Sequence, residues 1–346
     1  MLDKILQFFM NKKFVLITAV SMLFVFTGCA NSEQKAFVQP VQQVKELSVW
    51  EKKIKSTQQL KMGIITDTQV HPSRKNKSVK GPDAERYLKP RYGDAIDAFV
   101  TEMRIFKPDV IVVPGDIIEG TGDDDFVSAD GLRLVKEKIE VLGVPIIWAV
   151  GNHEVRSVTK AQYQEALGID YLNSSFEFGD YKIIVVDGNF YPDDTDVVPG
   201  GERYIRGHVA QSGIDFLTDE LQTDKQTIVF IHQPPLVGED INDRSSGGLL
   251  DNGNIIQALL DKYNALATLG GHIEYKRHLE KNDVDYYSLP GTIKSEAFPG
   301  AYYTAVFEND KSNVIMYYID PNTGKYINVD FEDTKDKSGH DIETKI

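Results

Sequence analysis

The sequence predicts an α/β fold, a four-layer αββα sandwich in which two mixed β-sheets are flanked by helices. Two observations support this prediction. From Leu60 onward, short apolar runs alternate with helix-like segments, as in chains whose strands and helices alternate. Further strand-like runs then follow without helices between them, which favours two sheets packed together with the helices outside.

Apolar runs supply the strands of this prediction. Five are short and almost uninterrupted by polar residues, as buried strands are, and they cover residues 62–65, 110–113, 146–150, 228–231 and 265–269. Later strand-like runs cover residues 181–186, 285–289, 302–307 and 313–319. We expect helices at residues 83–106, 128–142, 160–167, 212–221 and 252–263.

The domain that these elements form is expected to span residues 60–325. About 265 residues lie within the range that one α/β core can fill. Residues 29–59 contain six Gln and few apolar positions that could pack, which is typical of a flexible tether. Residues 326–346 are expected to form a charged C-terminal tail.

Residues 1–28 resemble a lipoprotein signal peptide. Lys4, Lys12 and Lys13 precede an apolar stretch at residues 14–26, which is too short to span a membrane comfortably as a mature helix. The stretch ends in Phe-Thr-Gly-Cys, similar to a bacterial lipobox, and Cys29 is the only cysteine in the chain. The alternatives are a secretory signal with an incidental cysteine and a plain membrane anchor. We expect Cys29 to be lipidated. The protein would then be anchored in a bacterial cell envelope, on the outer face of the cytoplasmic membrane or in the outer membrane.

The chain is acidic, with a formal net charge of −14 at pH 7. Removal of residues 1–28, which carry three Lys and one Asp, would lower this by two to −16. Nucleic-acid binding needs Lys and Arg gathered on one face, so no nucleic-acid partner is expected. A small phosphorylated substrate remains compatible with the charge, because bound divalent cations supply local positive charge.

Polar residues follow most of the buried runs at the point where each strand ends. Because strand ends at one edge of a sandwich converge in space, such Asp, Asn and His side chains are candidate metal ligands. The motifs are Thr-Asp-Thr-Gln, Gly-Asp-Ile-Ile-Glu, Gly-Asn-His-Glu, Ile-His-Gln-Pro-Pro and Gly-Gly-His-Ile-Glu. They contain Asp67, Gln69, Asp116, Glu119, Asn152, His153, His232, His272 and Glu274. This set predicts a metal-dependent hydrolase.

The ordered motifs resemble those of the calcineurin-like metallophosphoesterase family. The family pattern runs D-x-H, G-D-x-x-D, G-N-H-[ED], a lone H and G-H-x-H, and this chain keeps its order and most of its identities. Each motif alone is weak, whereas the ordered set is specific. The resemblance implies a metal-dependent phosphoric ester hydrolase acting on a phosphorylated small molecule. Phosphomono- or diesters would be hydrolysed by attack of a metal-bridging hydroxide at phosphorus.

The resemblance also implies two divalent metal ions that share one ligand. Asp116 would bridge the two ions. The other ligands implied for the first ion are Asp67, Gln69 and Glu274. Those implied for the second ion are Asn152, His232 and His272. A shared carboxylate holds such ions about 4 Å apart, the separation that in-line displacement at phosphorus requires.

His153 and Glu119 are the catalytic residues that the resemblance implies. In the family, the histidine of the G-N-H motif protonates the leaving oxygen or contacts the phosphate. The second acid of G-D-x-x-D pairs with that histidine, and Glu119 stands at its position. A carboxylate partner would raise the pKa of His153 and favour its acid form.

Two positions depart from the family pattern, and both belong to the first metal. Gln69 stands where the family has His, and Glu274 stands where it has the second His of G-H-x-H. Oxygen ligands suit hard ions, so Mn²⁺ or Mg²⁺ is favoured at the first site, while Fe, Zn or Mn is open at the second. One alternative is a non-catalytic surface lipoprotein that uses a degenerate scaffold for binding. Another is a hydrolase with only the second metal.

Other polar residues are candidates for the same site. His71 and His278 follow the altered ligands in sequence and could substitute for them, although loop or solvated positions are the simpler expectation. Arg203, Arg206 and Arg244 could bind a substrate phosphate, although surface ion pairs are their usual role.

Overall fold

Strands and helices alternate along the first part of the chain, as the sequence predicts. The computed structural model describes residues 59–70, 92–120, 125–202, 206–235 and 249–331, all within Leu47–Ile346, one of two units of the chain. The first half contains β1 (Gln59–Ile64), α2 (Tyr92–Phe106), β2 (Val110–Val113), α3 (Asp125–Glu140), β3 (Ile146–Trp148), α4 (Asn152–Ser157), α5 (Lys160–Leu167), β4 (Ser174–Phe178) and β5 (Tyr181–Val185). The second half contains α6 (Gln211–Glu220), β6 (Gln226–Phe230), α7 (Gly253–Lys262), β7 (Ala267–Gly270), β8 (Arg277–Lys281), β9 (Val284–Ser288), β10 (Tyr302–Glu308), β11 (Lys311–Ile319) and β12 (Tyr326–Asp330).

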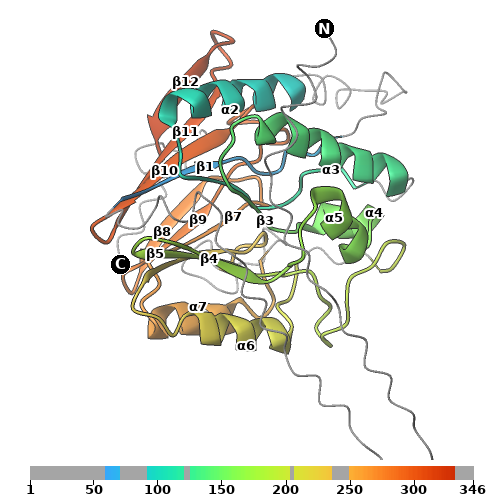
Figure 1. Ribbon diagram of the computed structural model, residues 1–346, viewed down its shortest axis with the longest axis vertical. Helices are drawn as coiled ribbons and strands as arrows, with labels where there is room; N and C mark the ends of the chain where they lie inside the picture. Colours follow the sequence, from blue (N-terminus) through green and yellow to red (C-terminus); the bar gives the residue numbers. More distant parts are fainter. Residues whose placement is uncertain (1–58, 71–91, 121–124, 203–205, 236–248, 332–346) are drawn as a thin grey trace, which may run out of the picture. The chain divides into compact units, whose positions relative to one another are not determined.

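Two six-stranded mixed sheets form the inner layers (Figure 1). The first sheet has the order β12-β11-β10-β1-β2-β3, in which β1, β2 and β3 are parallel and the other pairings are antiparallel. The second has the order β4-β5-β6-β7-β9-β8, in which β5, β6, β7 and β9 are parallel and the two edge pairings are antiparallel. Crossover helices between parallel strands place helices on the outer face of each sheet.

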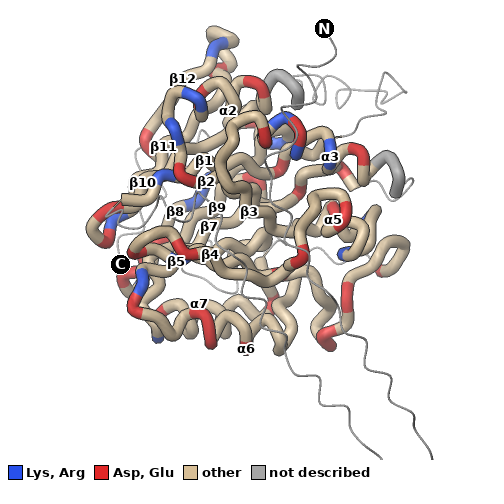
Figure 2. Tube along the Cα trace, viewed as in Figure 1, with Lys and Arg blue, Asp and Glu red and all other residues tan. Residues whose placement is uncertain are grey.

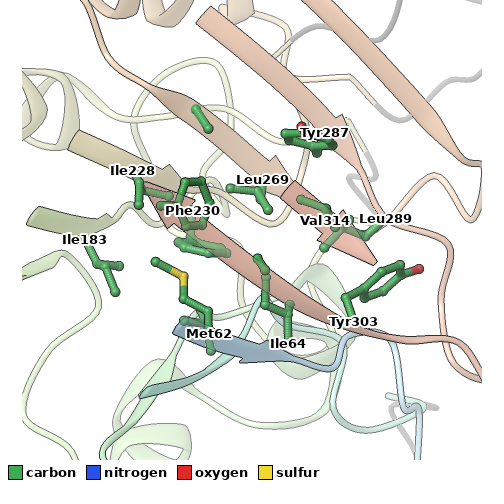
Figure 3. Close-up of a cluster of buried hydrophobic side chains, with 14 of the residues drawn as sticks. Met62, Ile64, Ile183, Ile228, Phe230, Leu269, Tyr287, Leu289, Tyr303 and Val314 are labelled. Atoms are coloured by element: carbon green, nitrogen blue, oxygen red, sulfur yellow. The ribbon is translucent and has the colours of Figure 1, made fainter. Parts of the chain in front are cut away.

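Three hydrophobic clusters join the four layers. In the central cluster, Met62 of the first sheet packs with Phe230 and other residues of the second (Figure 3). On the outer face of the first sheet, Phe99 of α2 packs in one cluster with Ile111 of β2. Ile256 of α7 belongs to the cluster on the outer face of the second sheet. Figure 1 shows α2 and α3 on one side and α6 and α7 on the other. The αββα prediction is therefore confirmed.

Burial on both faces explains why strand β2 has no polar position. In β2, Val110 and Val112 belong to the central cluster, whereas Ile111 and Val113 belong to the outer cluster. Successive side chains of a strand point to opposite faces, so a strand between two apolar layers needs an apolar residue at every position. Each fully buried Val or Ile side chain contributes about 1.5–3 kcal/mol to stability.

Helix α5 begins and ends at the predicted residues, 160 and 167, because its ends carry local signals. Thr159 is the N-cap, and its hydroxyl accepts a hydrogen bond of 3.2 Å from the amide of Gln162. Gly168 ends the helix with φ 65°, the left-handed conformation that glycine adopts readily.

Strand β12 extends the first sheet past residue 325, where the sequence analysis placed the start of the tail. Residues Tyr326–Asp330 pair antiparallel with β11, and Phe331 is buried in the central cluster. The expected start of the tail is therefore corrected to beyond residue 331. The sequence of β12 lacks a clear apolar pattern because β12 is an edge strand, and its apolar Ile327 is 38% exposed. The edge strands β4 and β8 were missed for the same reason.

Cys29 and the signal and tether segments lie outside the described residues, as do residues 332–346. Among the helices that are described, none is both long and apolar enough to cross a membrane. Along the described trace, Figure 2 shows Lys and Arg interspersed with Asp and Glu.

Candidate metal centre

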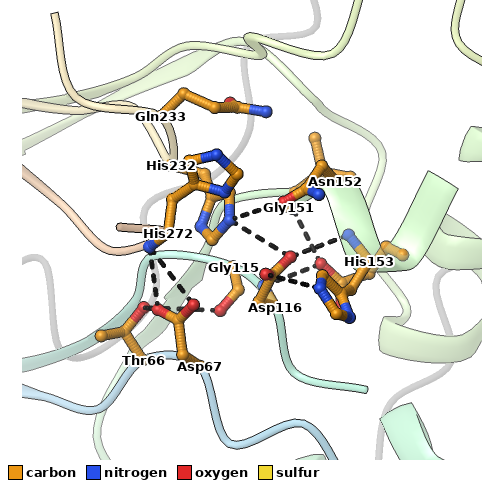
Figure 4. A network of polar contacts seen from close by, with 12 residues as sticks. Thr66, Asp67, Gly115, Asp116, Gly151, Asn152, His153, His232, Gln233 and His272 are labelled. Atoms are coloured by element: carbon orange, nitrogen blue, oxygen red, sulfur yellow. Dashed lines mark hydrogen bonds and ion pairs between the residues drawn. The ribbon is translucent and has the colours of Figure 1, made fainter. Parts of the chain in front are cut away.

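The predicted ligands lie on loops that follow β1, β2, β3, β6 and β7 (Figure 4). The first three strands run parallel in one sheet, and the last two run parallel in the other. Hydrogen bonds and close contacts join the two sets of loops across the sandwich. The backbone amide of His272 donates to the Asp67 carboxylate at 3.2 Å, and His232 Nε2 lies 3.2 Å from Asp116 Oδ1. The carboxyl ends of both sets of strands therefore meet at one site.

Four of the residues predicted as ligands of the second metal lie together as a candidate metal position. Asp116, His232 and His272 each place one ligand atom within 4.8 Å of the others. His232 Nε2 also lies 3.2 Å from Oδ1 of Asn152, the first residue of α4. The other ring nitrogen of His232 donates to the carbonyl of Pro114 at 2.8 Å. Fixing one imidazole nitrogen against a carbonyl and turning the other towards the site is typical of metal-binding histidines.

The three other residues predicted as ligands of the first metal lie close to one another. Gln69 Nε2 donates to Glu274 Oε1 at 3.3 Å, and Glu274 Oε2 accepts from the amide of Gly291 at 3.1 Å. The packing here requires glycine at 291, because a Cβ atom there would lie 2.1 Å from Glu274 Oε2 and 2.6 Å from the Cβ of Asp67. Asp67 is completely buried, and the hydroxyl of Thr66 donates to its carboxylate at 2.7 Å.

Burial and neighbouring carboxyl groups disfavour ionisation of two of the site's three carboxyl groups. Burial and the nearby Asp116 raise the pKa of Asp67 to about 7, and burial and Asp67 raise that of Glu274 well above its usual range. Burial would also raise the pKa of Asp116, but the neighbouring His153 and His232 hold it well below its usual range. A bound cation would stabilise all three ionised carboxylates.

A buried amide oxygen also favours a metal ion at the first position. Within the described residues, Gln69 Oε1 is buried without a hydrogen-bond partner. A buried amide oxygen without a partner is costly unless it meets a cation or a donor. Together with the carboxylates and imidazoles, this oxygen supplies an oxygen-rich position beside a mixed nitrogen and oxygen position. The donor set fits two divalent cations.

The two histidines of the second position differ in protonation. Burial would lower the pKa of His232, but the adjacent Asp116 carboxylate raises it to about 9. Burial and the nearby charge of His232 lower the pKa of His272 to about 3. Their rings are 5.1 Å apart, and at neutral pH in the metal-free protein only His232 is protonated on both nitrogens and positively charged, whereas His272 is neutral.

His153 does not pair with the Glu119 side chain, in contrast to the sequence expectation. Its Nδ1 donates to the backbone carbonyl of Glu119, while the Glu119 carboxylate lies 3.7 Å from Lys294 Nζ. Arg156 donates to His153 Nε2 at 2.8 Å, so this nitrogen accepts and the ring is neutral. Burial, with the charges of Lys294 and Arg156, lowers the pKa of His153 to about 4. The expected rise in that pKa was wrong.

Glu154 supports the site, and the sequence analysis did not select it. Its carboxylate accepts from the amides of Gly151 at 2.7 Å, Asp116 at 2.9 Å and Ile118 at 3.1 Å. These bonds fix the loop that carries Asp116 against the start of α4. The signal was present in the sequence, because the glutamate of Gly-Asn-His-Glu follows the helix start by the spacing of a capping residue.

Five of the ligands have a left-handed backbone. Their φ values lie between 41° and 70°, a region that residues other than glycine, Asn and Asp rarely adopt. They are Asp67, Gln69, Asp116, His272 and Glu274. Each such residue costs about 1–3 kcal/mol, so the surrounding packing and hydrogen bonds must hold the loops in place.

The other candidate residues lie elsewhere or outside the described chain. His278 lies on β8, with its Nε2 2.8 Å from Asp285 Oδ1 and its ring stacked on Tyr287, so it is a structural residue. His71, Arg203 and Arg244 fall outside the described residues, and Arg206 lies between β5 and α6.

The chain is similar to known phosphoesterases. The family model for calcineurin-like phosphoesterases matches residues 60–274. A cAMP/cGMP dual specificity phosphodiesterase of Mycobacterium tuberculosis is 26% identical over 179 residues, covering 49% of each chain. The glycerophosphodiester phosphodiesterase GpdQ of Enterobacter lignolyticus is 21% identical over 196 residues, covering 54% of this chain and 63% of its own. The chain thus spans less than two thirds of the length of these relatives.

Among solved structures, the crystal structure of a dimetal phosphatase from Danio rerio has the same fold. It matches with a TM-score of 0.57 and 15% identity, covering 79% of this chain and 99% of its own.

Proposed function

Since the chain belongs to the calcineurin-like phosphoesterase family, we propose that it is a two-metal hydrolase of small-molecule phosphodiesters. One observation carries the proposal: the cluster of Asp116, His232 and His272 lies directly beside the carboxylates of the first position. Diesters are favoured over monoesters because the curated relatives compared above are named as phosphodiesterases.

The metal ions, when bound, would neutralise charge on the phosphoryl oxygens and lower the pKa of a water. The protein supplies their positions. Asp116 lies between the two ligand sets, and Glu154 fixes the backbone of Asp116 through its amide hydrogen bond. The His272 amide holds the Asp67 carboxylate, so one residue serves both positions through its ring and its backbone.

His153 is the proposed proton donor to the leaving oxygen. In the substrate-free site its only proton is on Nδ1, bound to the Glu119 carbonyl, and Nε2 lies 3.6 Å from Asp116 Oδ2. A phosphate bound at this position would place negative charge beside Nε2, and nearby negative charge raises an imidazole pKa. Protonation of Nε2 would therefore accompany substrate binding.

Metal identity and location complete the proposal. Gln69 and Glu274 offer oxygen, which favours Mn²⁺ or Mg²⁺ at the first position, while the two imidazoles at the second suit Fe, Zn or Mn. The proposed location is the bacterial cell envelope, with lipid attached at Cys29; support comes from the lipobox-like sequence alone.

Metal analysis and a substrate panel test the proposal together. Protein purified without chelator should contain up to two divalent ions, and it should hydrolyse cyclic nucleotides, glycerophosphodiesters or bis(p-nitrophenyl) phosphate faster than matched monoesters. Asp116→Asn should lose metal and activity, whereas Asp215→Asn on the exposed face of α6 should keep both. Full metal occupancy without hydrolysis of any ester would instead support a binding scaffold.

A further inference from the structure

We propose that Lys294 binds a non-bridging phosphoryl oxygen of the substrate and that Glu119 holds its side chain in place. This inference rests on the proposed function and adds a substrate-binding residue to it. Lys294 lies in none of the motifs described above, and it is separated by 175 positions from Glu119, its partner in the structure.

The loop that carries Lys294, between β9 and β10, is anchored over the first metal position. The amide and hydroxyl of Thr292 both donate to the carbonyl of Thr66, at 3.1 Å and 2.8 Å. The amide of Gly291 donates to Glu274 Oε2 at 3.1 Å. Lys294 lies two residues after Thr292. Thr292 is hydrogen-bonded to Thr66, the residue that precedes Asp67.

The ammonium group of Lys294 lies beside the residues that surround the reacting centre. Its Nζ is 3.7 Å from Glu119 Oε1, and the backbone carbonyl of Glu119 holds His153 Nδ1. The ammonium group is thus linked through Glu119 to the proposed proton donor.

The pairing with Glu119 leaves Lys294 able to bind a second partner. A separation of 3.7 Å allows charge attraction but is too long for a hydrogen bond. The Lys294 side chain is 24% exposed and that of Glu119 13%, so the pair is partly buried but not closed off from solvent, and the carboxylate limits the movement of the ammonium group. Lysine is a common point-charge ligand of phosphate.

The altered first position gives a reason for an added cation. Glu274 supplies a carboxyl group where the family pattern has an imidazole, and Asp67 and Asp116 lie near it. A carboxylate at this position weakens the attraction of the site for an anionic phosphate. Lys294, on the loop that is hydrogen-bonded to Glu274 and Thr66, would restore one positive charge for a phosphoryl oxygen.

Kinetics of Lys294→Met and Lys294→Arg in the Mn²⁺-loaded enzyme test the proposal, with Lys325→Met at an exposed turn as the matched control. Bis(p-nitrophenyl) phosphate serves as the substrate, and inorganic phosphate serves as the competitive inhibitor and calorimetric ligand. Loss of one charge-assisted hydrogen bond should raise KM and the phosphate Kd about 10- to 100-fold in Lys294→Met, with a smaller change in kcat. Lys294→Arg should recover most of this loss, and Lys325→Met should match the wild type.

Glu119→Gln should raise KM less than Lys294→Met does, because the ammonium group remains but is less well positioned. Metal content, measured on every variant, should stay at the wild-type value. Phosphate affinity within twofold of the wild type in metal-loaded Lys294→Met would overturn the proposal and leave a structural ion pair. Loss of metal from that variant would overturn it too, by assigning Lys294 to metal retention. If the wild type hydrolyses no ester, the proposed function fails, while phosphate calorimetry still decides the role of Lys294.

Discussion

Gln69 Nε2 donates a hydrogen bond of 3.3 Å to Glu274 Oε1, so the two residues that depart from the family pattern are partners in space. They lie 205 positions apart and follow strands of different sheets, β1 and β7. Both departures thus meet at one metal position, and both side chains still offer oxygen. This arrangement favours an altered metal preference over the loss of the site.

Restoring the two histidines should change the metal preference. Wild-type activity should be highest with Mn²⁺ or Mg²⁺, because the first position offers amide and carboxylate oxygen. The Gln69→His/Glu274→His double variant should shift that preference towards Zn²⁺ or iron. Reconstitution of chelator-treated protein with single metals, followed by activity and elemental analysis, measures the shift. Two tightly bound Zn²⁺ ions in both forms would contradict the prediction.

Removal of the proposed proton donor should affect poor leaving groups most. His153→Ala should keep its metal content and slow hydrolysis of alkyl phosphodiesters on the order of 100-fold, as the loss of a general acid does. With nitrophenyl esters the decrease should be smaller, because nitrophenolate leaves without protonation. Steady-state rates across a series of leaving-group pKa values test this. Equal losses across the series would indicate that His153 only binds substrate.

The metal-free protein should become less stable as the pH rises from about 4 to about 7, through the contribution of Asp67. Burial raises the pKa of Asp67 from 3.8 to about 7, so the folded state holds this proton more tightly than the unfolded chain does. The contribution is complete below about pH 4 and is lost as the pH rises through about 7.

Asp67→Asn removes this titration without removing the side chain. In chelator, urea unfolding from pH 5 to pH 8 should show the wild type losing stability relative to the variant, by on the order of 1 kcal/mol or more. Asp215→Asn changes an exposed carboxylate, so the difference in unfolding free energy between the wild type and this variant should not change with pH. If the difference in unfolding free energy between the wild type and Asp67→Asn also does not change with pH, the folded protein tolerates the ionised carboxylate.

Cys29→Ser should block lipid attachment if the lipobox-like sequence is processed as expected. The variant should accumulate as an unprocessed precursor and should not be labelled by a fatty-acid analogue. Labelling followed by mass spectrometry of the N-terminus measures both effects. Continued lipidation, or cleavage that still occurs before residue 29, would rule out the lipobox.

Much of the fold was predictable because its central strands are buried on both faces. The apolar runs around Val112 and Phe230 gave the parallel strands directly, and the alternation of strands with helix-like segments gave the layers. Edge strands such as β12 could not be recognised, because an exposed edge does not need an apolar pattern. Ile327 shows this, with a large part of its side chain in solvent.

The composition of the site was more predictable than its contacts. Strand-end motifs identified Asp116 and His232, and the structure brings them within 3.2 Å. The predicted pairing of the Glu119 carboxylate with His153 was wrong, and its partner in the structure is Lys294. No pattern in the sequence relates a loop residue such as Lys294 to a glutamate so far away. The left-handed backbone of Gln69 was also not predictable, since nothing local favours it and tertiary contacts impose it.

The ligands are divided between the sheets, with Asp116 and Asn152 from one and His232 and His272 from the other. Ions bound there would therefore act as cross-links between the two sheets. Any opening that separates the layers would have to break metal bonds before the central cluster is exposed. Unfolding rate, protease resistance and amide exchange in β1, β2, β6 and β7 should consequently depend on metal occupancy, so a binding site at one rim governs the kinetic persistence of the whole domain.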